Sequence, residues 1–321
     1  MTILYKSNYI NIVRFILIEN LTNFLLDYFE TSELNCLPEE YGGGKIFSRP
    51  FIGVAKGNDP IFLKFKEVVG SEHYTPLEMW LASGQKQVPT SNLNIISIVF
   101  PFTNEIRMKS ISPIRLSKIT LPAEIYSIAR NFAKEFRNYI MEQTIAFLQN
   151  KGYNAISGKL SEAYTLVARK DFYSTWSENH VAFAAGLGTF GLHEGLITEQ
   201  GCNVRLASVI TDAPFEVTPR KSDEPYANCL YYAKATCREC AKNCPANAIT
   251  EKGYDKMKCN KYRNKVAKNM VPRIKPILKA YSRRINWKYK AQNYPVGCEL
   301  CQFGVECMDK NPMVRHDLDF D

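Results

Sequence analysis

Apolar and polar positions along the first two thirds of the chain follow two periods, and these periods predict its secondary structure. Ile95–Phe100 is a short apolar run that ends at Pro101, which is typical of a buried strand. Ala123–Asn150 repeats apolar residues at helical spacing, and Gly152 follows as a C-terminal cap. Other runs predict a helix at Ile61–Val69 and strands at Phe51–Ala55, Tyr153–Ile156, Ala163–Ala168 and Val204–Ile210.

The same patterns divide the chain. Ile10–Phe29 is apolar but interrupted by charged and amide residues, so it predicts an amphipathic helix or a strand–helix pair and not a membrane span. Strands and helices alternate up to about residue 215, and Pro214–Pro225 then turns rich in Pro, Lys, Asp and Glu. With 321 residues, of which 45% are hydrophobic, we expect an α+β protein with an N-terminal helical segment at 1–50, an α/β domain at 51–215 and a cysteine-rich domain at 216–321.

Eight of the ten cysteines lie in that last domain. Three of them have the spacing C-x2-C-x3-C-P, and the residues after Pro245, Ala246–Ile249, are expected to begin a short helix. The ferredoxin pattern for [4Fe–4S] clusters is C-x2-C-x2-C-x3-C-P, and two such clusters need eight cysteines. Zinc and disulfides are the alternatives, but zinc usually takes two cysteine pairs without this proline. The eight are Cys229, Cys237, Cys240, Cys244, Cys259, Cys298, Cys301 and Cys307.

Cysteine usage and charge add two further expectations. A long chain whose cysteines cluster, with no signal peptide before them, favours a reduced, cytoplasmic and anaerobic setting. The net charge is +9, yet Lys256–Lys290 alone holds 13 Lys or Arg and no acid. The rest of the chain is therefore slightly acidic, and this basic segment is a local feature. Cluster thiolates, an acidic ferredoxin or an RNA backbone are possible partners for it, and a solvated face is the alternative.

The segment Trp176–Thr198 begins like a helix with small residues and then breaks into four closely spaced glycines. A dinucleotide fingerprint needs the opposite order, with glycines that follow a strand and open a helix. Glycines at this density instead let the backbone turn through positive φ or approach something closely.

Asn179–Asp212, followed by the two cysteine groups, resembles the epoxyqueuosine reductase and reductive dehalogenase superfamily, in particular the iron–sulfur proteins related to epoxyqueuosine reductase. The motifs that carry the resemblance are A-G-L-G-T-F-G-L, G-L-I-T and V-R-L-A-S-V-I-T-D. It extends over roughly residues 50 to 321. The resemblance implies a nitroreductase-like α/β domain that binds cobalamin, followed by a two-cluster ferredoxin-like domain in which residues 256–290 form a basic insertion.

The resemblance also implies ligands. Cys237, Cys240 and Cys307 would hold one [4Fe–4S] cluster with Cys229 as the fourth ligand, for which Cys202 is the rival. The other cluster would be held by Cys244, Cys259, Cys298 and Cys301. The corrinoid would lie beside His180, Ala185, Gly186, Leu187, Gly188, Thr189, Phe190 and Gly191.

Catalytic candidates follow from the same resemblance. Epoxyqueuosine reductases have an acidic proton donor before the glycine motif, and that place falls on Phe172, with Asp171 one residue away. Their motif lysine is replaced here by Leu192. Reductive dehalogenases use a tyrosine and a basic residue, for which Tyr173 and Arg205 are the candidates.

The function implied is that of an oxidoreductase. Electrons from a ferredoxin or flavodoxin would pass through the clusters to a corrinoid that reduces a small organic or nucleoside substrate. One alternative is epoxyqueuosine reduction on tRNA. Another is an iron–sulfur electron carrier, not itself an enzyme, that reduces the corrinoid of a different protein.

Overall fold

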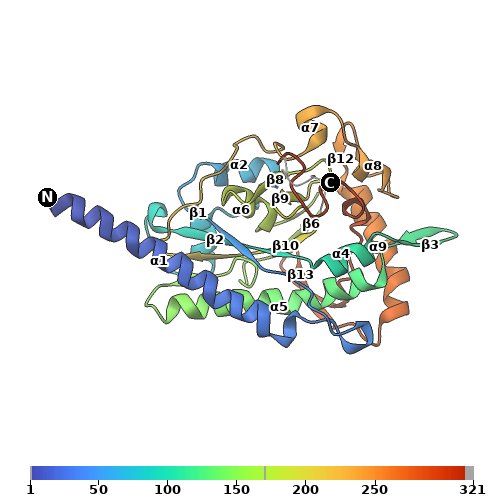
Figure 1. Cartoon of the computed structure of the whole chain (residues 1–321), viewed down its shortest axis with the longest axis horizontal. Coiled ribbons are helices and arrows are strands. Elements are labelled where there is room, and N and C mark those ends of the chain that lie inside the picture. The colour runs from blue at the N-terminus through green and yellow to red at the C-terminus, as the bar shows by residue number, and fades with distance from the viewer. Residues whose placement is uncertain (1, 170, 315–321) are drawn as a thin grey trace, which may run out of the picture.

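The computed structural model describes residues 2–169 and 171–314, which form a mixed α+β structure (Figure 1). The helices are α1 (Thr2–Thr31), α2 (Ile61–Val68), α3 (Pro76–Ala82), α4 (Asn104–Ser110), α5 (Glu124–Gln149), α6 (Glu178–Ala184), α7 (Leu230–Lys234), α8 (Glu239–Lys242) and α9 (Lys256–Ile274). The strands are β1 (Phe51–Lys56), β2 (Asn94–Pro101), β3 (Ile114–Leu116), β4 (Ile119–Leu121), β5 (Ala155–Ile156), β6 (Leu166–Ala168), β7 (Phe172–Ser174), β8 (Gly188–Phe190), β9 (Leu196–Thr198), β10 (Val204–Thr211), β11 (Ile249–Thr250), β12 (Gly253–Tyr254), β13 (Tyr281–Ile285) and β14 (Lys288–Asn293).

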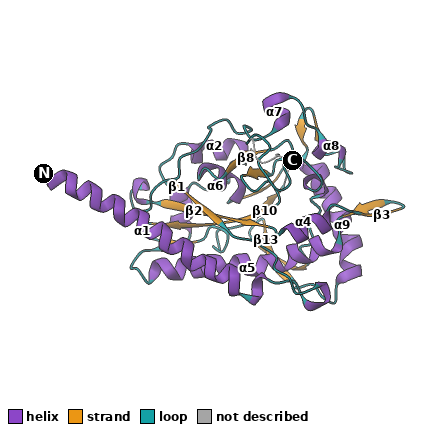
Figure 2. Ribbon diagram, viewed as in Figure 1, coloured by secondary structure: helices purple, strands orange, loops and turns teal. Residues whose placement is uncertain are grey.

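The central sheet has the strand order β1–β2–β10–β5, and all three pairings are antiparallel. Every residue of β2 is buried, because helices cover both faces of the sheet (Figure 2). Successive side chains of a strand point to opposite faces. Ile96 and Ile98 therefore join the core beneath α1 and α5, whereas Ile95 and Val99 join the core formed with α2, α3 and α6.

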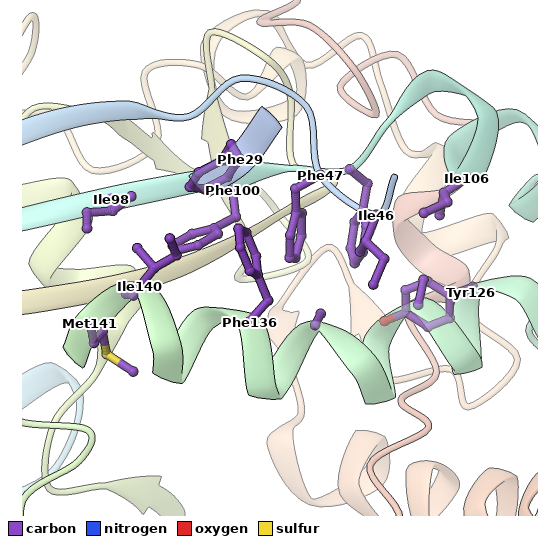
Figure 3. Close-up of a cluster of buried hydrophobic side chains, with 14 of the residues drawn as sticks. Phe29, Ile46, Phe47, Ile98, Phe100, Ile106, Tyr126, Phe136, Ile140 and Met141 are labelled. Carbon is purple, nitrogen blue, oxygen red and sulfur yellow. The ribbon is translucent and has the colours of Figure 1, made fainter. Parts of the chain in front are cut away.

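The larger of the two cores is built on aromatic side chains from α1, α5 and β2 (Figure 3). The ring of Phe136 on α5 lies 4.9 Å from that of Phe29 on α1 and 6.2 Å from that of Phe100 on β2, measured between centroids. The buried amide of Asn35 fixes the chain beside this core, because it donates to the carbonyls of Phe29 and Phe47 and accepts from the backbone N–H of Phe47. The N-terminal segment thus packs into the same core as residues 51–215.

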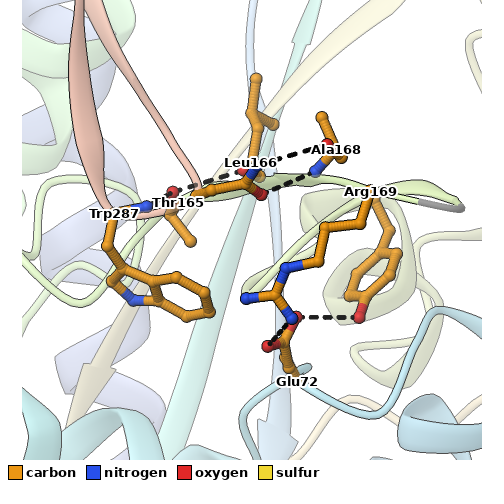
Figure 4. Close-up of polar contacts among 8 residues, drawn as sticks. Glu72, Thr165, Leu166, Ala168, Arg169 and Trp287 are labelled. Atoms are coloured by element: carbon orange, nitrogen blue, oxygen red, sulfur yellow. Dashed lines mark hydrogen bonds and ion pairs between the residues drawn. The ribbon is translucent and has the colours of Figure 1, made fainter.

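A second sheet joins the basic segment to the α/β part of the chain, with strand order β14–β13–β6–β7. β13 runs parallel to β6 through Ile285 and Leu166. The turn of the β13–β14 hairpin is held by the backbone N–H of Trp287, which donates to Thr165 Oγ1 at 3.0 Å (Figure 4). The basic insertion is therefore half helix, in α9, and half hairpin, and the hairpin docks on residues more than 100 positions away in the sequence.

Most predicted elements are confirmed. The strands at Phe51–Ala55 and Ile95–Phe100 and the long helix after Ala123 are β1, β2 and α5, and the N-terminal pattern forms one helix, α1. The helix expected at Ala246–Ile249 is wrong. Asn247 adopts a left-handed φ of 49°, and the chain enters the β11–β12 hairpin instead. No helix among the described residues is long and apolar enough to cross a membrane.

Candidate functional site

Four cysteines line one small cavity at the end of the molecule that carries α7 and α8. Cys229 is the N-cap of α7, Cys240 lies in α8, and Cys237 and Cys307 come from the loops beside them. Burial, with the thiols of Cys307, Cys229 and Cys237 adding to it, raises the pKa of Cys240 to about 12. Thiols crowded in this way become thiolates when a cationic metal centre binds them, so the donor set suits an iron–sulfur cluster.

Four other cysteines line a second cavity of about 270 Å³. Cys244 follows α8, Cys259 lies in the first turn of α9, and Cys298 and Cys301 come from one loop near the C-terminus. Burial raises the pKa of Cys298 to about 12, and burial together with the other three thiols raises that of Cys301. The close approach of this loop to the body of the protein needs Gly297, where a Cβ would lie 2.3 Å from the Arg130 side chain.

Cys202 lies beside the first cavity but does not line it. Its Sγ is 3.8 Å from that of Cys307, whose Sγ is also 3.6 Å from His193 Nε2. His193 Nδ1 accepts the backbone N–H of Gly195, so Nε2 carries the proton and donates to sulfur. Hydrogen bonds from Cys202 and His193 lower the pKa of Cys307. Cys202, Cys307 and His193 could also hold a metal ion, with ligand atoms within 4.8 Å of one another.

A large cavity of about 840 Å³ borders the second cysteine cavity, and the two share Asn179, Glu194, Tyr254 and Arg263. Its wall includes aromatic rings from α2, β7, α6 and β8. This volume lies toward the upper end of the range for small-molecule and cofactor sites. His180 lies in this wall, where burial lowers its pKa to about 3 and Ser177 Oγ is 2.8 Å from its Nδ1. Its imidazole is therefore neutral at pH 7.

Of the residues expected beside a corrinoid, only His180 and Phe190 line this cavity. Gly186 and Gly188, which lie between these two residues in the sequence, pack against protein backbone instead. A Cβ on Gly186, whose φ is +75°, would lie 2.9 Å from the carbonyl oxygen of Pro219, and one on Gly188 would lie 2.4 Å from that of Ile197. Close packing of these chain segments accounts for those two glycines. Ala185, Leu187, Thr189 and Gly191 likewise lie outside the wall of the cavity.

The three catalytic candidates do not line one common cavity. Tyr173 lines the large cavity, and its hydroxyl donates to Glu72 Oε2 at 3.0 Å. Asp171 is exposed and lines none of the cavities described here. Arg205, on β10, lies in a separate hollow of about 320 Å³, where it donates to Tyr126 Oη at 2.7 Å and to Glu299 Oε2 at 2.8 Å.

The hollow that contains Arg205 also contains charged residues outside the predicted catalytic set. Glu178 is half-buried there, and its two carboxylate oxygens are shielded from solvent without a hydrogen-bond partner among the described residues. Burial raises the pKa of Glu178. Arg130 and Arg137 reach the hollow from α5, and with Lys134 they occupy positions i, i+4 and i+7 of that helix. Such a basic stripe along one face of an amphipathic helix is the signal that could have identified these two arginines.

No family model matches the chain. An epoxyqueuosine reductase from Leadbetterella byssophila is 29% identical over 119 residues, which are 37% of this chain and 32% of that protein. A solved catabolic reductive dehalogenase in complex with 3-bromo-4-hydroxybenzoic acid has a TM-score of 0.43 and 19% identity over 66% of this chain and 27% of its own. A solved epoxyqueuosine reductase from Streptococcus thermophilus has a TM-score of 0.38 and 15% identity over 88% of this chain and 66% of its own.

The resemblance stated from the motifs is confirmed by the curated match, which names an epoxyqueuosine reductase. The match spans about a third of the length of that relative.

Proposed function

We propose that this chain is an iron–sulfur oxidoreductase in which the eight cysteines hold two [4Fe–4S] clusters beside a corrinoid-binding cavity. The observation that carries the proposal is the division of these cysteines into two cavities with four in each. In both cavities one ligand group comes from the α8 region and another from the loop that ends at Cys307. Cys229 lines the first cavity and Cys202 does not, which favours Cys229 as the fourth ligand there.

The large cavity suits the second cofactor by position and lining. It has aromatic walls, it shares four residues with the second cysteine cavity, and the neutral His180 lies in its wall. When bound, two clusters would supply one-electron transfer, and a corrinoid would supply low-valent cobalt to reduce an electrophilic carbon. Around the reacting group, Tyr173 Oη would deliver a proton and Glu72 would orient that hydroxyl. The rings of Phe65 and Phe190 would exclude water.

Metal content tests this proposal. Protein prepared without oxygen and with cobalamin supplied should contain about eight iron atoms, four for each cluster, and about one cobalt atom per chain. Iron near eight without retained cobalt would refute the corrinoid enzyme and support the electron carrier. Iron near zero with two zinc ions bound would refute the clusters themselves.

Reduction of epoxyqueuosine in tRNA is the second candidate, and the exposed basic residues of α9 favour it. Lys258, Lys261, Lys265 and Lys268 are exposed on this helix, and the rings of Trp287 and Tyr289 are 43% and 67% exposed on the neighbouring hairpin. Bases of single-stranded RNA stack on such rings. Binding of a tRNA stem-loop should then weaken with a log–log salt slope of about −0.7 to −0.9 per phosphate contacted. If the tRNA stem-loop does not bind, or if its binding does not depend on salt, tRNA is refuted as the substrate and a small molecule remains.

A further inference from the structure

A further hollow, the basic hollow, has a volume of about 600 Å³. It is lined by eight basic residues and one acid. Arg130, Lys134 and Arg137 enter it from α5, and Arg283 and Arg284 enter it from β13. α5 and β13 lie next to each other in the fold, since Lys134 Nζ reaches the carbonyl of Ser282 on β13 (Figure 1). The hollow therefore forms where the basic hairpin docks on the α/β part of the chain.

Counter-charges for these cations are few. The one acid in the wall, Glu162, pairs with Arg284. Glu299 is shared between two cations, at 2.7 Å from Arg130 and 2.8 Å from Arg205. The side chains of Arg137 and Arg283 have no hydrogen-bonding or ion-pair partner among the described residues, and the charge of Glu178 acts on Arg137 from the neighbouring hollow without a hydrogen bond between them.

Several guanidinium donors in this region are buried and unused. The Nε atoms of Arg130, Arg137 and Arg205 lack an acceptor among the described residues. A buried donor without a partner costs free energy, and so does a cluster of like charges. Burial, followed by the charges of Lys159 and Arg137, lowers the pKa of Lys134 to about 8. Burial, followed by the charge of Arg205, lowers the pKa of Arg137 to about 10.

An anion in the hollow would remove both costs. Guanidinium groups form paired hydrogen bonds to phosphate and carboxylate, and these bonds are strongest where water is excluded. The basic hollow shares Phe172 and Arg263 with the large cavity. With the hollow of about 320 Å³ it shares four basic residues, which are Arg130, Arg137, Lys159 and Arg205. A ligand anchored there would therefore reach toward the redox site.

We propose that this basic hollow binds the phosphate or carboxylate group of a small organic molecule between α5 and β13. A small molecule fits better than RNA because the unpaired donors lie in the wall of a cavity, whereas a nucleic-acid backbone follows exposed cations such as those along α9. Binding is measured without turnover, so the inference stands or fails independently of the proposed redox function.

The test is isothermal titration calorimetry on the full-length protein, purified without oxygen, at constant ionic strength. Inorganic phosphate and succinate are separate probes, which distinguish a phosphate from a carboxylate ligand, and an RNA stem-loop is the third. At least one small anion should bind, and Arg137→Gln should weaken it about tenfold or more, because each hydrogen bond to a charged group contributes on this scale. Arg283→Gln, on the rim at β13, should weaken it as well and provides a second variant if Arg137→Gln does not fold.

Lys268→Gln is the matched control, because it removes one positive charge from the exposed face of α9 outside the hollow. Its affinity for phosphate and for succinate should equal that of the unmodified protein. Three results would overturn the proposal: neither small anion binds, all three variants bind equally well, or only the RNA stem-loop binds and loses affinity in Arg137→Gln.

Discussion

Replacing Glu299 with glutamine tests how strongly the loop of the second cysteine group is fastened to the central sheet. Glu299 follows Cys298, and its carboxylate accepts hydrogen bonds from Arg130 on α5 and Arg205 on β10 at 2.7 and 2.8 Å. The Glu299 side chain is only 19% exposed. Glutamine keeps the shape of the side chain but leaves two arginines without their shared negative charge.

Two independent arguments give a similar value for the folding free energy that Glu299→Gln should cost. The two arginines lower the pKa of Glu299 from 4.5 to about 2 against the opposing effect of burial. At about 1.4 kcal/mol per pH unit, this corresponds to roughly 3 kcal/mol of folding free energy. Because the folded-state pKa is depressed, that contribution is complete above pH 4.5 and is lost as the pH falls toward 2. Removing one partner of a buried ion pair typically costs about 3–5 kcal/mol.

The assay is urea unfolding at pH 7 without oxygen, followed by tryptophan fluorescence. With a urea dependence of about 3 kcal/mol per molar, Glu299→Gln should lower the midpoint by about 1 M. Glu251→Gln is the matched control, because Glu251 pairs with Arg238 on the surface, where the two side chains are 64% and 50% exposed. Such a pair contributes about 0–1 kcal/mol. Equal, small shifts in both variants would refute the reasoning.

Three further predictions concern ligand assignment and packing. In electron paramagnetic resonance, the same cluster signal should be lost in Cys244→Ala and in Cys298→Ala. The other cluster signal should be lost in Cys240→Ala. If Cys240→Ala and Cys244→Ala lost the same signal and Cys298→Ala a different one, the assignment would be wrong. Gly53→Ala should lower the urea midpoint, because its Cβ would lie 2.3 Å from a backbone carbonyl at the end of α6, and an unchanged midpoint would show that this contact relaxes. Asn35→Ala should cost about 2 kcal/mol or more, because three backbone groups lose their buried amide partner, and a loss below about 0.5 kcal/mol would contradict that estimate.

Much of the core could be predicted from local pattern alone. A strand such as Ile95–Phe100 is apolar on both faces because helices cover both sides of the sheet, and a sequence window contains this information directly. The aromatic stripe of α5 is apolar for the same local reason. The helix expected at Ala246–Ile249 failed because Asn247 adopts a left-handed φ and turns the chain into a hairpin. Asparagine adopts this conformation more readily than most residues, so its presence in the tetrapeptide was a signal against a helix.

Long-range pairing accounts for the rest. The charge of the basic segment is visible in the sequence, but its pairing of β13 with β6 is not. The same holds for its ion pairs to distant acids, which are Arg273–Glu124, Lys279–Glu135 and Arg284–Glu162. Arg205 is another example, because Asp212 lies only seven residues after it in the sequence. The structure gives it Glu299, 94 residues away, whereas Asp212 accepts from Asn154. Such pairs depend on the whole fold.

The two proposals meet at Glu299. Its carboxylate holds Arg130 and Arg205, which also line the basic hollow, and its backbone continues directly from Cys298. An anion that binds either arginine competes with Glu299 and loosens its hold on the second cysteine loop. Hydrogen bonding and local charge around the sulfurs set the properties of a cluster. Phosphate or succinate should therefore change the paramagnetic signal that Cys298→Ala removes and leave the one that Cys240→Ala removes unchanged. Equal changes in both signals would mean that the anion acts elsewhere.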